Sequence, residues 1–392
     1  MLLKVILILG FILAVTIGAH VVLYKSIVNF FVITNTRVKF GLFACLLFLA
    51  LSFMSSFFLL RWHENEFSIG YYVFSATWTG AFINFLLAAG VSWLLIGFLR
   101  ITGHNPNTRS IAASWFILAV FYSTFGVWNA LHPRIKTINF QIKNLPDHWK
   151  NKTIFQLSDV HLGHIHGQRF LKNVIEKVNA ANPEIVFITG DLFDGMISSF
   201  MHFAKPLKLL KAPKGVFFIT GNHETYVGLT RVLKVLNQTK IKILHNEVIE
   251  IDGLQIIGIS YPGIKKVSEI HGFETLKQNP SHKNPRILLF HTPTNICPRG
   301  KDELDRHFMT YWVPDTNFEL HQHLGVDLQL SGHSHAGQIL PFGFLTKLIF
   351  KGYDYGLRQE SGFYIYTTSG VGTWGPPLRT GNSPEIVALT LN

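Results

Sequence analysis

Five short apolar runs in the second half of the chain each end in a residue type that binds metal ions. The runs are TIFQL, EIVFI, GVFFI, RILLF and DLQL, and they lead into LSDVH, TGD, TGNHE, LFH and SGHSH. Runs of this length predict buried strands. Open α/β sheets bind ligands outside the carboxyl ends of their strands, so the pattern predicts a metal site at one sheet edge. The candidate ligands are Asp159, His161, Asp191, Asn222, His291, His333 and His335.

This ligand set indicates two transition-metal ions. A mixture of imidazole and oxygen ligands suits Mn, Fe, Zn or Co better than Mg or Ca. Asp191 has two carboxylate oxygens, which suit it to bridge two ions ~3.5–4 Å apart, and a metal-bound water with a pKa near ~7 is a nucleophile at neutral pH. His223 follows Asn222 directly and can serve as a general acid facing the leaving-group oxygen. The sequence thus predicts hydrolysis of a phosphoester by metal-bound hydroxide.

The order D-x-H, G-D, G-N-H-E, H and G-H-x-H resembles the calcineurin-like metallophosphoesterases over about residues 150–392. Within that family, LSGHSHAGQI and TSGVGTWGPPLRTGNSPEIVALTL are similar to the YkuE and YaeI branch, many of whose members are membrane-associated or exported. The resemblance implies an α/β fold, a four-layer αββα sandwich with two mixed sheets. It also implies one dinuclear centre with two ligand sets: Asp159, His161 and His335 on one metal and Asn222, His291 and His333 on the other, with Asp191 as the bridge and His223 as the catalytic histidine.

Four long apolar stretches precede this region, at about residues 5–24, 40–60, 76–99 and 110–131. Each has roughly the ~20 residues that cross a bilayer as a helix. A cleavable signal peptide is an alternative for the first stretch only. We therefore expect a transmembrane region of about four helices over residues 1–134, a catalytic domain over 135–392, and a multi-pass protein of the bacterial inner or plasma membrane. The basic residues near the spans divide 5 against 6, which leaves the side of the catalytic domain undecided.

The formal charge of +12 is concentrated near the predicted spans. Residues 1–150 carry 11 Lys and Arg against 3 Asp and Glu, whereas residues 151–392 carry 24 against 20. Anionic headgroups are the simplest partner for such a distribution. The second part has no basic stripe interleaved with aromatic residues, so we expect no binding of nucleic acid.

Four further residues lie near the motifs, and two of them have two interpretations each. Arg379 could bind a substrate phosphate bidentately or brace the turn at Pro376 and Pro377. Glu224 could orient an imidazole or cap the helix that follows it. His164 and His166 are expected to be loop residues near the pocket mouth and not ligands.

One segment bears on the substrate. Residues 341–353, PFGFLTKLIFKGY, are apolar with Lys347 and Lys351 four residues apart, and they follow the last histidine ligands. Such a segment could be core, or it could lie on a bilayer surface with Phe344 and Phe350 immersed. We favour a phosphorylated lipid or membrane-linked phosphoester or pyrophosphate as substrate. The alternatives are a general phosphodiesterase or phosphomonoesterase for soluble nucleotides, and a membrane sensor with a non-catalytic module.

Overall fold

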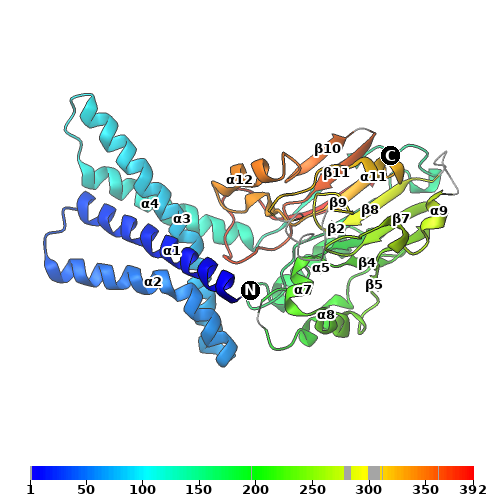
Figure 1. Cartoon of the computed structure of the whole chain (residues 1–392), viewed down its shortest axis with the longest axis horizontal. Coiled ribbons are helices and arrows are strands. Elements are labelled where there is room, and N and C mark those ends of the chain that lie inside the picture. The colour runs from blue at the N-terminus through cyan, green and yellow to red at the C-terminus, as the bar shows by residue number, and fades with distance from the viewer. Residues whose placement is uncertain (1, 196, 278–283, 299–309, 311, 361) are drawn as a thin grey trace. The chain divides into compact units, whose positions relative to one another are not determined.

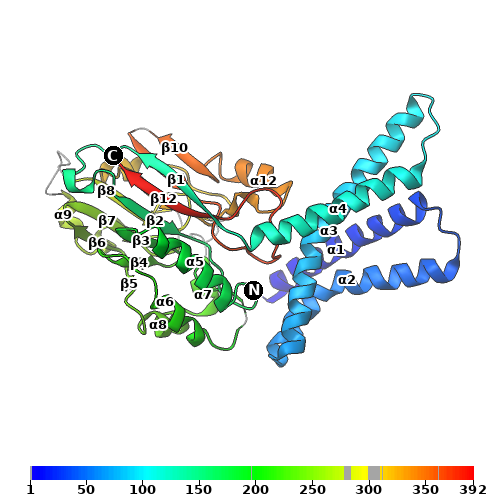
Figure 2. The ribbon, with the colours of Figure 1, turned by 180° about the vertical axis from the view of Figure 1, so that it is seen from behind.

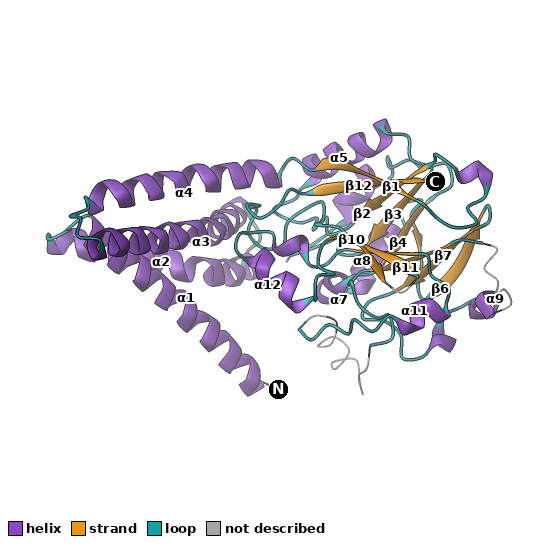
Figure 3. Cartoon of the chain, turned by 90° about the horizontal axis from the view of Figure 1, so that it is seen from above, coloured by secondary structure: helices purple, strands orange, loops and turns teal. Residues whose placement is uncertain are grey.

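The computed structural model describes residues 2–195, 197–277, 284–298, 310, 312–360 and 362–392. The chain divides into two compact units, Met1–Trp128 with Gly375–Thr380 and Asn129–Trp374 with Gly381–Asn392. The first unit holds four long helices and the second holds both β-sheets (Figures 1 and 3).

The four helices of the first unit are each long and apolar enough to cross a membrane, which confirms the predicted membrane helices. They are α1 (Leu2–Phe30), α2 (Thr36–Trp62), α3 (Glu66–Ile101) and α4 (Thr108–Ala130). Helix α3 starts ten residues before the predicted span because Asn65 and Ser68 form a capping box there, ahead of the most apolar part. Its 36 residues span about 54 Å, which is more than the ~30 Å of a bilayer core.

Polar side chains join the helices of this unit in pairs. Asn84 of α3 donates to the Ser123 hydroxyl of α4 at 2.9 Å. Trp93 of α3 donates to the Ser26 hydroxyl of α1 at 2.9 Å. Hydrogen bonds of this kind, together with close packing, hold helices together where lipid supplies no hydrophobic driving force.

The first sheet of the second unit contains six strands in the order β1-β12-β2-β3-β4-β5 (Figure 2). Their bounds are β1 (Arg134–Phe140), β12 (Glu385–Leu391), β2 (Thr153–Leu157), β3 (Ile185–Thr189), β4 (Val216–Ile219) and β5 (Lys242–Ile243). Strand β12 is parallel to β1 and antiparallel to β2. Strands β2 to β5 are mutually parallel, so the sheet is mixed.

The second sheet also contains six strands, in the order β10-β11-β9-β8-β7-β6. Their bounds are β10 (Gly356–Glu360), β11 (Phe363–Thr367), β9 (Leu328–Ser331), β8 (Arg286–Phe290), β7 (Leu254–Ile259) and β6 (Glu247–Ile251). The four central strands are parallel and the two outer strands are antiparallel to their neighbours.

Alternate residues of the central strands face different apolar clusters, which defines the layers. In β3, Val186 and Ile188 join a cluster that includes side chains of α5 (Gln168–Ala180) and α8 (Leu229–Leu236). Phe187 joins a cluster that also contains Leu289 of β8, so it lies between the sheets. On the outer face of β8, Leu288 packs in a third cluster beside α9 (Phe273–Lys277) and α11 (Glu319–His323). The predicted four-layer αββα arrangement with two mixed sheets is confirmed.

The remaining elements in the described part of the chain are short. They are the α-helices α6 (Ala204–Leu207), α7 (Asn222–Val227) and α12 (Phe342–Ile349), and the 3-10 helices η1 (Asp147–Trp149), η2 (Met201–Phe203), η3 (Val267–Glu269) and η4 (His335–Gly337).

Candidate metal centre

The loops that follow five parallel strands bring the candidate ligands together. Strands β2, β3 and β4 run in one direction in the first sheet, and β8 and β9 do so in the second. The loops carry Asp159 after β2, Asp191 after β3, Asn222 after β4, His291 after β8 and His333 after β9. Parallel strands end at the same edge of their own sheet, where open sheets bind ligands. The loops of the two sheets meet here, because Asp191 after β3 lies in one group with His291 and His333 after β8 and β9.

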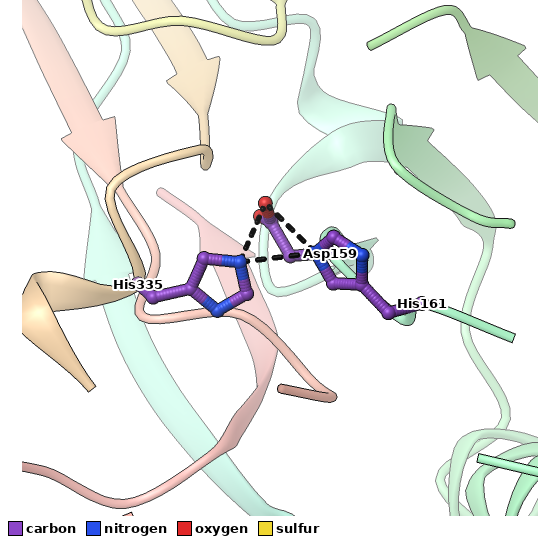
Figure 4. A group of neighbouring side chains, drawn as sticks. All are labelled: Asp159, His161 and His335. Carbon is purple, nitrogen blue, oxygen red and sulfur yellow. Dashed lines mark hydrogen bonds and ion pairs between the residues drawn. The ribbon is translucent and has the colours of Figure 1, made fainter. Parts of the chain in front are cut away.

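Asp159, His161 and His335 form one group of buried side chains (Figure 4). The Nε2 atoms of His161 and His335 lie 3.0 Å apart. Oδ1 of Asp159 lies 3.5 Å from Nε2 of His335 and 4.0 Å from Nε2 of His161. One carboxylate and two imidazoles therefore direct their donor atoms to a common point.

Asp191, His291 and His333 form a second group, and Asn222 lies against it. Nε2 of His291 lies 3.1 Å from both Oδ2 of Asp191 and Oδ1 of Asn222. Nδ1 of His333 lies 2.9 Å from Oδ1 of Asn222. Asp191 also approaches the first group, because its Oδ2 lies 4.0 Å from Nε2 of His161.

The surroundings of His291 fit a bound cation. Its Nδ1 lies 2.8 Å from the carbonyl oxygen of Thr189, to which only a protonated nitrogen can donate. In a neutral ring Nε2 then presents a lone pair to Asp191 and Asn222 oxygens, neither of which can donate. Positive charge is therefore needed between these atoms. Without a metal a proton on Nε2 supplies it, because the Asp191 carboxylate outweighs burial and raises the pKa of His291 to about 9. A cation can take the place of that proton, and the mixed nitrogen and oxygen donor set suits a divalent transition metal.

The backbone holds several of these residues in the left-handed region. The φ angles are 54° at Asp159, 52° at His161, 51° at Asp191, 72° at His333 and 50° at His335. Non-glycine residues in this conformation are strained, and such strain is found mainly at functional sites. The sheet edge therefore sets the direction of these side chains at a cost in backbone energy.

Two glycines allow the ligand loops to approach one another. A Cβ atom at Gly221 would overlap the Asp191 carboxylate, and one at Gly332 would overlap the Asp159 carboxylate and the Ser158 side chain. Only glycine fits either position without displacing a candidate ligand.

His223 lies beside the two groups and is oriented by two aspartates. Its backbone N–H donates to Oδ1 of Asp191 at 2.8 Å, and its Nδ1 lies 2.8 Å from Oδ1 of Asp194. Oδ2 of Asp194 lies 3.3 Å from Nδ1 of His161, so one carboxylate contacts two imidazoles. Sequence reasoning missed Asp194. The available signal was its place three residues after Asp191 in the same loop.

Charges within the site shift its pKa values strongly. Burial lowers the pKa of His223, but the Asp191 and Asp194 carboxylates outweigh burial and raise it to about 9. Burial opposes ionisation of Asp194, yet hydrogen bonds with His161 and His223 hold the pKa of its carboxyl well below the usual range. Burial raises the pKa of Asp159. Perturbed groups of this kind are concentrated at functional sites.

Glu224 has a role that combines capping with support of the Asp191 loop. Its fully buried carboxylate accepts the backbone N–H of Gly221 at 2.7 Å, which caps α7, and that of Asp191 at 2.9 Å. It also accepts the N–H groups of Leu192 and Phe193 at 2.9 and 3.2 Å. The capping interpretation therefore holds for α7, the helix that contains Glu224, and the same side chain also fixes the Asp191 loop.

Three other residues lie in places that bear on their predicted roles. The Arg379 side chain is fully buried, and its backbone N–H donates to the carbonyl oxygen of Gly126 at 2.9 Å; its contact with substrate stays a prediction. His166 is fully buried, and its Nε2 accepts the N–H of Thr373 at 2.9 Å. Phe350 is also buried, with its ring centroid 5.9 Å from that of His333, so of the two interpretations of residues 341–353 the core interpretation holds for this side chain.

Comparisons with known proteins agree with this architecture. The family model for calcineurin-like phosphoesterases matches residues 152–337. An uncharacterized metallophosphoesterase of Helicobacter pylori strain J99 is 31% identical over 315 residues, which cover 79% of this chain and 78% of that protein. A transmembrane protein with metallophosphoesterase domain from Danio rerio is 27% identical, covering 88% of this chain and 79% of that protein. The uncharacterized metallophosphoesterase YkuE of Bacillus subtilis is 29% identical, covering 68% and 89%. This chain also has four apolar N-terminal helices. The chain therefore belongs to the metallophosphoesterases, a family of metal-dependent phosphoesterases.

Proposed function

We propose that residues 135–392 form a dinuclear, metal-dependent phosphoesterase domain, anchored in a bacterial inner or plasma membrane, that hydrolyses a phosphoester or pyrophosphate bond of a lipid or membrane-linked substrate. The observation that carries the hydrolytic part is the pair of buried ligand groups joined through Asp191. Two divalent transition-metal ions (Mn, Fe, Zn or Co), when bound, would supply a water of lowered pKa and positive charge beside the phosphate.

The chain's own residues have distinct roles in this proposal. Asp159, His161 and His335 would hold one ion, and Asn222, His291 and His333 would hold the other. Asp191 would contribute to both sets. His223 presents Nε2 to the leaving-group oxygen, because its Nδ1 is engaged by Asp194 at 2.8 Å. A proton held on Nε2 is then available to the departing oxygen.

Helix α12 supports the lipid part of the proposal. Phe344 and Leu348 are 73% and 77% exposed, and Leu345 is 51% exposed. Lys347 and Lys351 add positive charge to the same short segment. A short helix with exposed aromatic and aliphatic residues and flanking lysines is typical of segments that lie at a membrane surface, where anionic headgroups attract the lysines.

The same helix packs directly on the segment that carries the last two histidine ligands. A Cβ atom at Gly337 would overlap the backbone of Gly343, so the two glycines bring α12 against η4. Ser334 donates its hydroxyl to the carbonyl oxygen of Asp354, and Thr346 of α12 donates to the Asp354 carboxylate at 3.1 Å. A lipid surface held by α12 would be presented to the region of His333 and His335.

The test is a hydrolysis screen on full-length protein in nanodiscs, supplemented with Mn²⁺, Zn²⁺, Fe²⁺ or Co²⁺ in turn. Mono- and diesters and pyrophosphates are offered both dissolved in water and carried on lipids in the same nanodisc. We expect metal-dependent hydrolysis, measured as the alcohol or monoester product, that the Asp191→Asn variant lacks, with higher kcat/KM for the lipid-borne substrates. Equal kcat/KM for both classes would favour the soluble-nucleotide enzyme. Metal binding without hydrolysis of any substrate would favour the non-catalytic module.

A further inference from the structure

Six residues near the C-terminus belong to the helical unit although their neighbours on both sides belong to the other unit. Trp374 and Gly381 are part of the unit that holds the sheets, whereas Gly375–Thr380 is part of the unit that holds α1 to α4. The chain therefore passes from one unit to the other and returns within eight residues.

Glycines of α3 and α4 bring this segment against the helices. A Cβ atom at Gly80 of α3 would lie 2.9 Å from Cβ of Pro376 and 3.2 Å from Cβ of Leu378. A Cβ atom at Gly126 of α4 would lie 2.7 Å from Cγ2 of Thr380. Both glycines are thus contact positions that tolerate no side chain without movement of the segment, in the manner of small residues at helix contacts in membranes.

Hydrogen bonds also hold residues 375–380 against α4. The N–H of Arg379 donates to the carbonyl oxygen of Gly126 at 2.9 Å, and the hydroxyl of Tyr122 donates to the carbonyl oxygen of Thr380 at 2.5 Å. Packing and polar contacts therefore act together, and movement of α3 or α4 would move residues 375–380.

Both ends of the segment are bonded to the stretch that carries His335. The N–H of Trp374 donates to Oε1 of Gln338 at 2.9 Å, and Nε2 of Gln338 donates back to the Trp374 carbonyl oxygen at 3.1 Å. The N–H of Gly381 donates to the Gln338 carbonyl oxygen at 3.0 Å. The Asn382 side chain donates to the carbonyl oxygens of His335 and Ala336 at 2.8 and 3.1 Å.

The stretch that receives these bonds has a strained backbone. The φ angles of His335, Ala336 and Gln338 are 50°, 47° and 49°. Non-glycine residues remain in this region only where surrounding contacts determine their conformation. The direction of the His335 imidazole therefore depends on the contacts made by residues 374, 381 and 382.

We propose that α3 and α4, through Gly375–Thr380, position His335 in the metal centre, so that the helices stabilise the site as well as anchor it. Gly80, Gly126 and Asn382 are then positioning residues. The inference rests on the proposed role of His335 as a metal ligand. It predicts that a change within the helices loosens residues 335–338 and weakens metal binding by the group Asp159, His161 and His335.

The main test compares Gly80→Val with Gly90→Val in full-length protein in nanodiscs. Gly90 lies in the same helix, and a Cβ atom there would meet nothing within 4 Å. We expect Gly80→Val, but not Gly90→Val, to raise hydrogen–deuterium exchange at the amides of Gln338 and Gly381. We also expect it to lower metal affinity roughly 10–100-fold, as loss of contacts that orient a ligand does.

A second variant covers the case in which Gly80→Val fails to fold. Asn382→Asp keeps the side-chain shape but removes both N–H donors to the His335 stretch, and it leaves the helices unchanged.

A rescue variant adds Leu378→Ala to Gly126→Ala, because the Gly126 Cβ would lie 2.9 Å from Cγ of Leu378. The double variant should recover part of the protection from hydrogen–deuterium exchange that Gly126→Ala loses. That recovery would demonstrate direct packing between positions 126 and 378.

The outcomes separate this inference from the proposed function. Exchange and metal content are measured without substrate, so a wild-type protein that binds metal but hydrolyses nothing would defeat only the proposed function. Exchange and metal content in Gly80→Val and Asn382→Asp equal to those of Gly90→Val would overturn the positioning role, whatever the activity.

Discussion

Nδ1 of His223 lies 2.8 Å from Oδ1 of Asp194, and the other oxygen of the same carboxylate lies 3.3 Å from Nδ1 of His161. This carboxylate fixes which nitrogen of His223 faces the site, because an N–H on Nδ1 donates to Asp194 and leaves Nε2 for the substrate. It also raises the pKa of His223, whose value of about 9 keeps the ring protonated at neutral pH in the absence of metal. Asp194 therefore connects a candidate acid to a candidate ligand.

The first prediction follows from that connection. Asp194→Asn should lower kcat for esters with poor leaving groups, which need a proton from His223, more than for activated aryl esters, which do not. General acid catalysis contributes typically ~10²–10⁴-fold, so His223→Ala sets the upper limit of the loss. Rates on matched alkyl and nitrophenyl esters measure the difference. A control is Asp252→Asn, which removes an exposed carboxylate paired with Lys214. Equal losses on both ester types would rule out assistance to the leaving group.

The second prediction concerns Asp191. Its carboxylate lies within 4.0 Å of an imidazole from each ligand group, at 3.1 Å from His291 and 4.0 Å from His161. Asp191→Asn should therefore lower the content of both metals, whereas Asn222→Ala should lower chiefly one. Elemental analysis after dialysis against a low metal concentration gives the two stoichiometries. Two metals retained in the Asp191→Asn protein would refute the bridging role.

Much of the fold could be predicted because its central strands are buried on both faces. Such strands appear as continuous apolar runs, as in β3 and β8, and each is followed by a polar loop that carries a candidate ligand. The position of the candidate ligands in short motifs that follow strands made the ligand set visible without a structure. Helix α3 was underestimated because its first turns are less apolar than its centre.

Features that depend on the course of a loop could not be predicted. Asp194 lies in the loop after β3 but beyond the TGD motif, and its contacts with His161 and His223 arise from the path of that loop. Phe350 and Phe344 are both apolar residues of one segment, yet one is buried and the other is 73% exposed, because the chain turns at the end of α12. Gly375–Thr380 belongs to the helical unit, and no periodic pattern in the sequence indicates this.

The third prediction concerns Glu224 and stability. Its two carboxylate oxygens accept four backbone N–H groups, and Glu224→Gln replaces one oxygen by an NH₂ group that cannot accept. A buried donor left without a partner costs about 1–3 kcal/mol. We therefore expect Glu224→Gln to lower the free energy of unfolding of the unit that holds the sheets by about that amount. Denaturant unfolding of the detergent-solubilised protein measures it. The exposed Glu176→Gln should behave as wild type, and an equally stable Glu224→Gln would show that the loop does not need this carboxylate.

The fourth prediction is a dependence of stability on pH through His321. Burial lowers the pKa of this histidine to about 3, and its ring stacks on Phe363 with centroids 5.4 Å apart. The unfolded chain binds a proton near pH 6.5 and the folded chain does not, so stability is lost as the pH falls below about 6.5. At pH 5 the loss from this group is about 2 kcal/mol. His321→Phe should remove that part of the difference between unfolding at pH 7.5 and pH 5. The control is His323→Phe, an exposed position on the same helix, and an unchanged difference in His321→Phe would contradict the assignment.

The last prediction concerns α12 and the bilayer. Phe344 and Leu348 are exposed and belong to no described apolar cluster, so changing both to Ser should leave the melting temperature nearly unchanged. If the helix lies at the membrane surface, the double variant should raise KM for a lipid-borne ester in nanodiscs and leave KM for a small soluble ester unaltered. Leu209→Ser, at a 53% exposed position of the same unit, controls for the general loss of an exposed apolar side chain.

Phe350→Ser should behave differently: the side chain is buried beside His333, and its loss should lower stability and both activities together. Parallel losses on both substrates in the Phe344 and Leu348 variant would end the case for a membrane-bound α12.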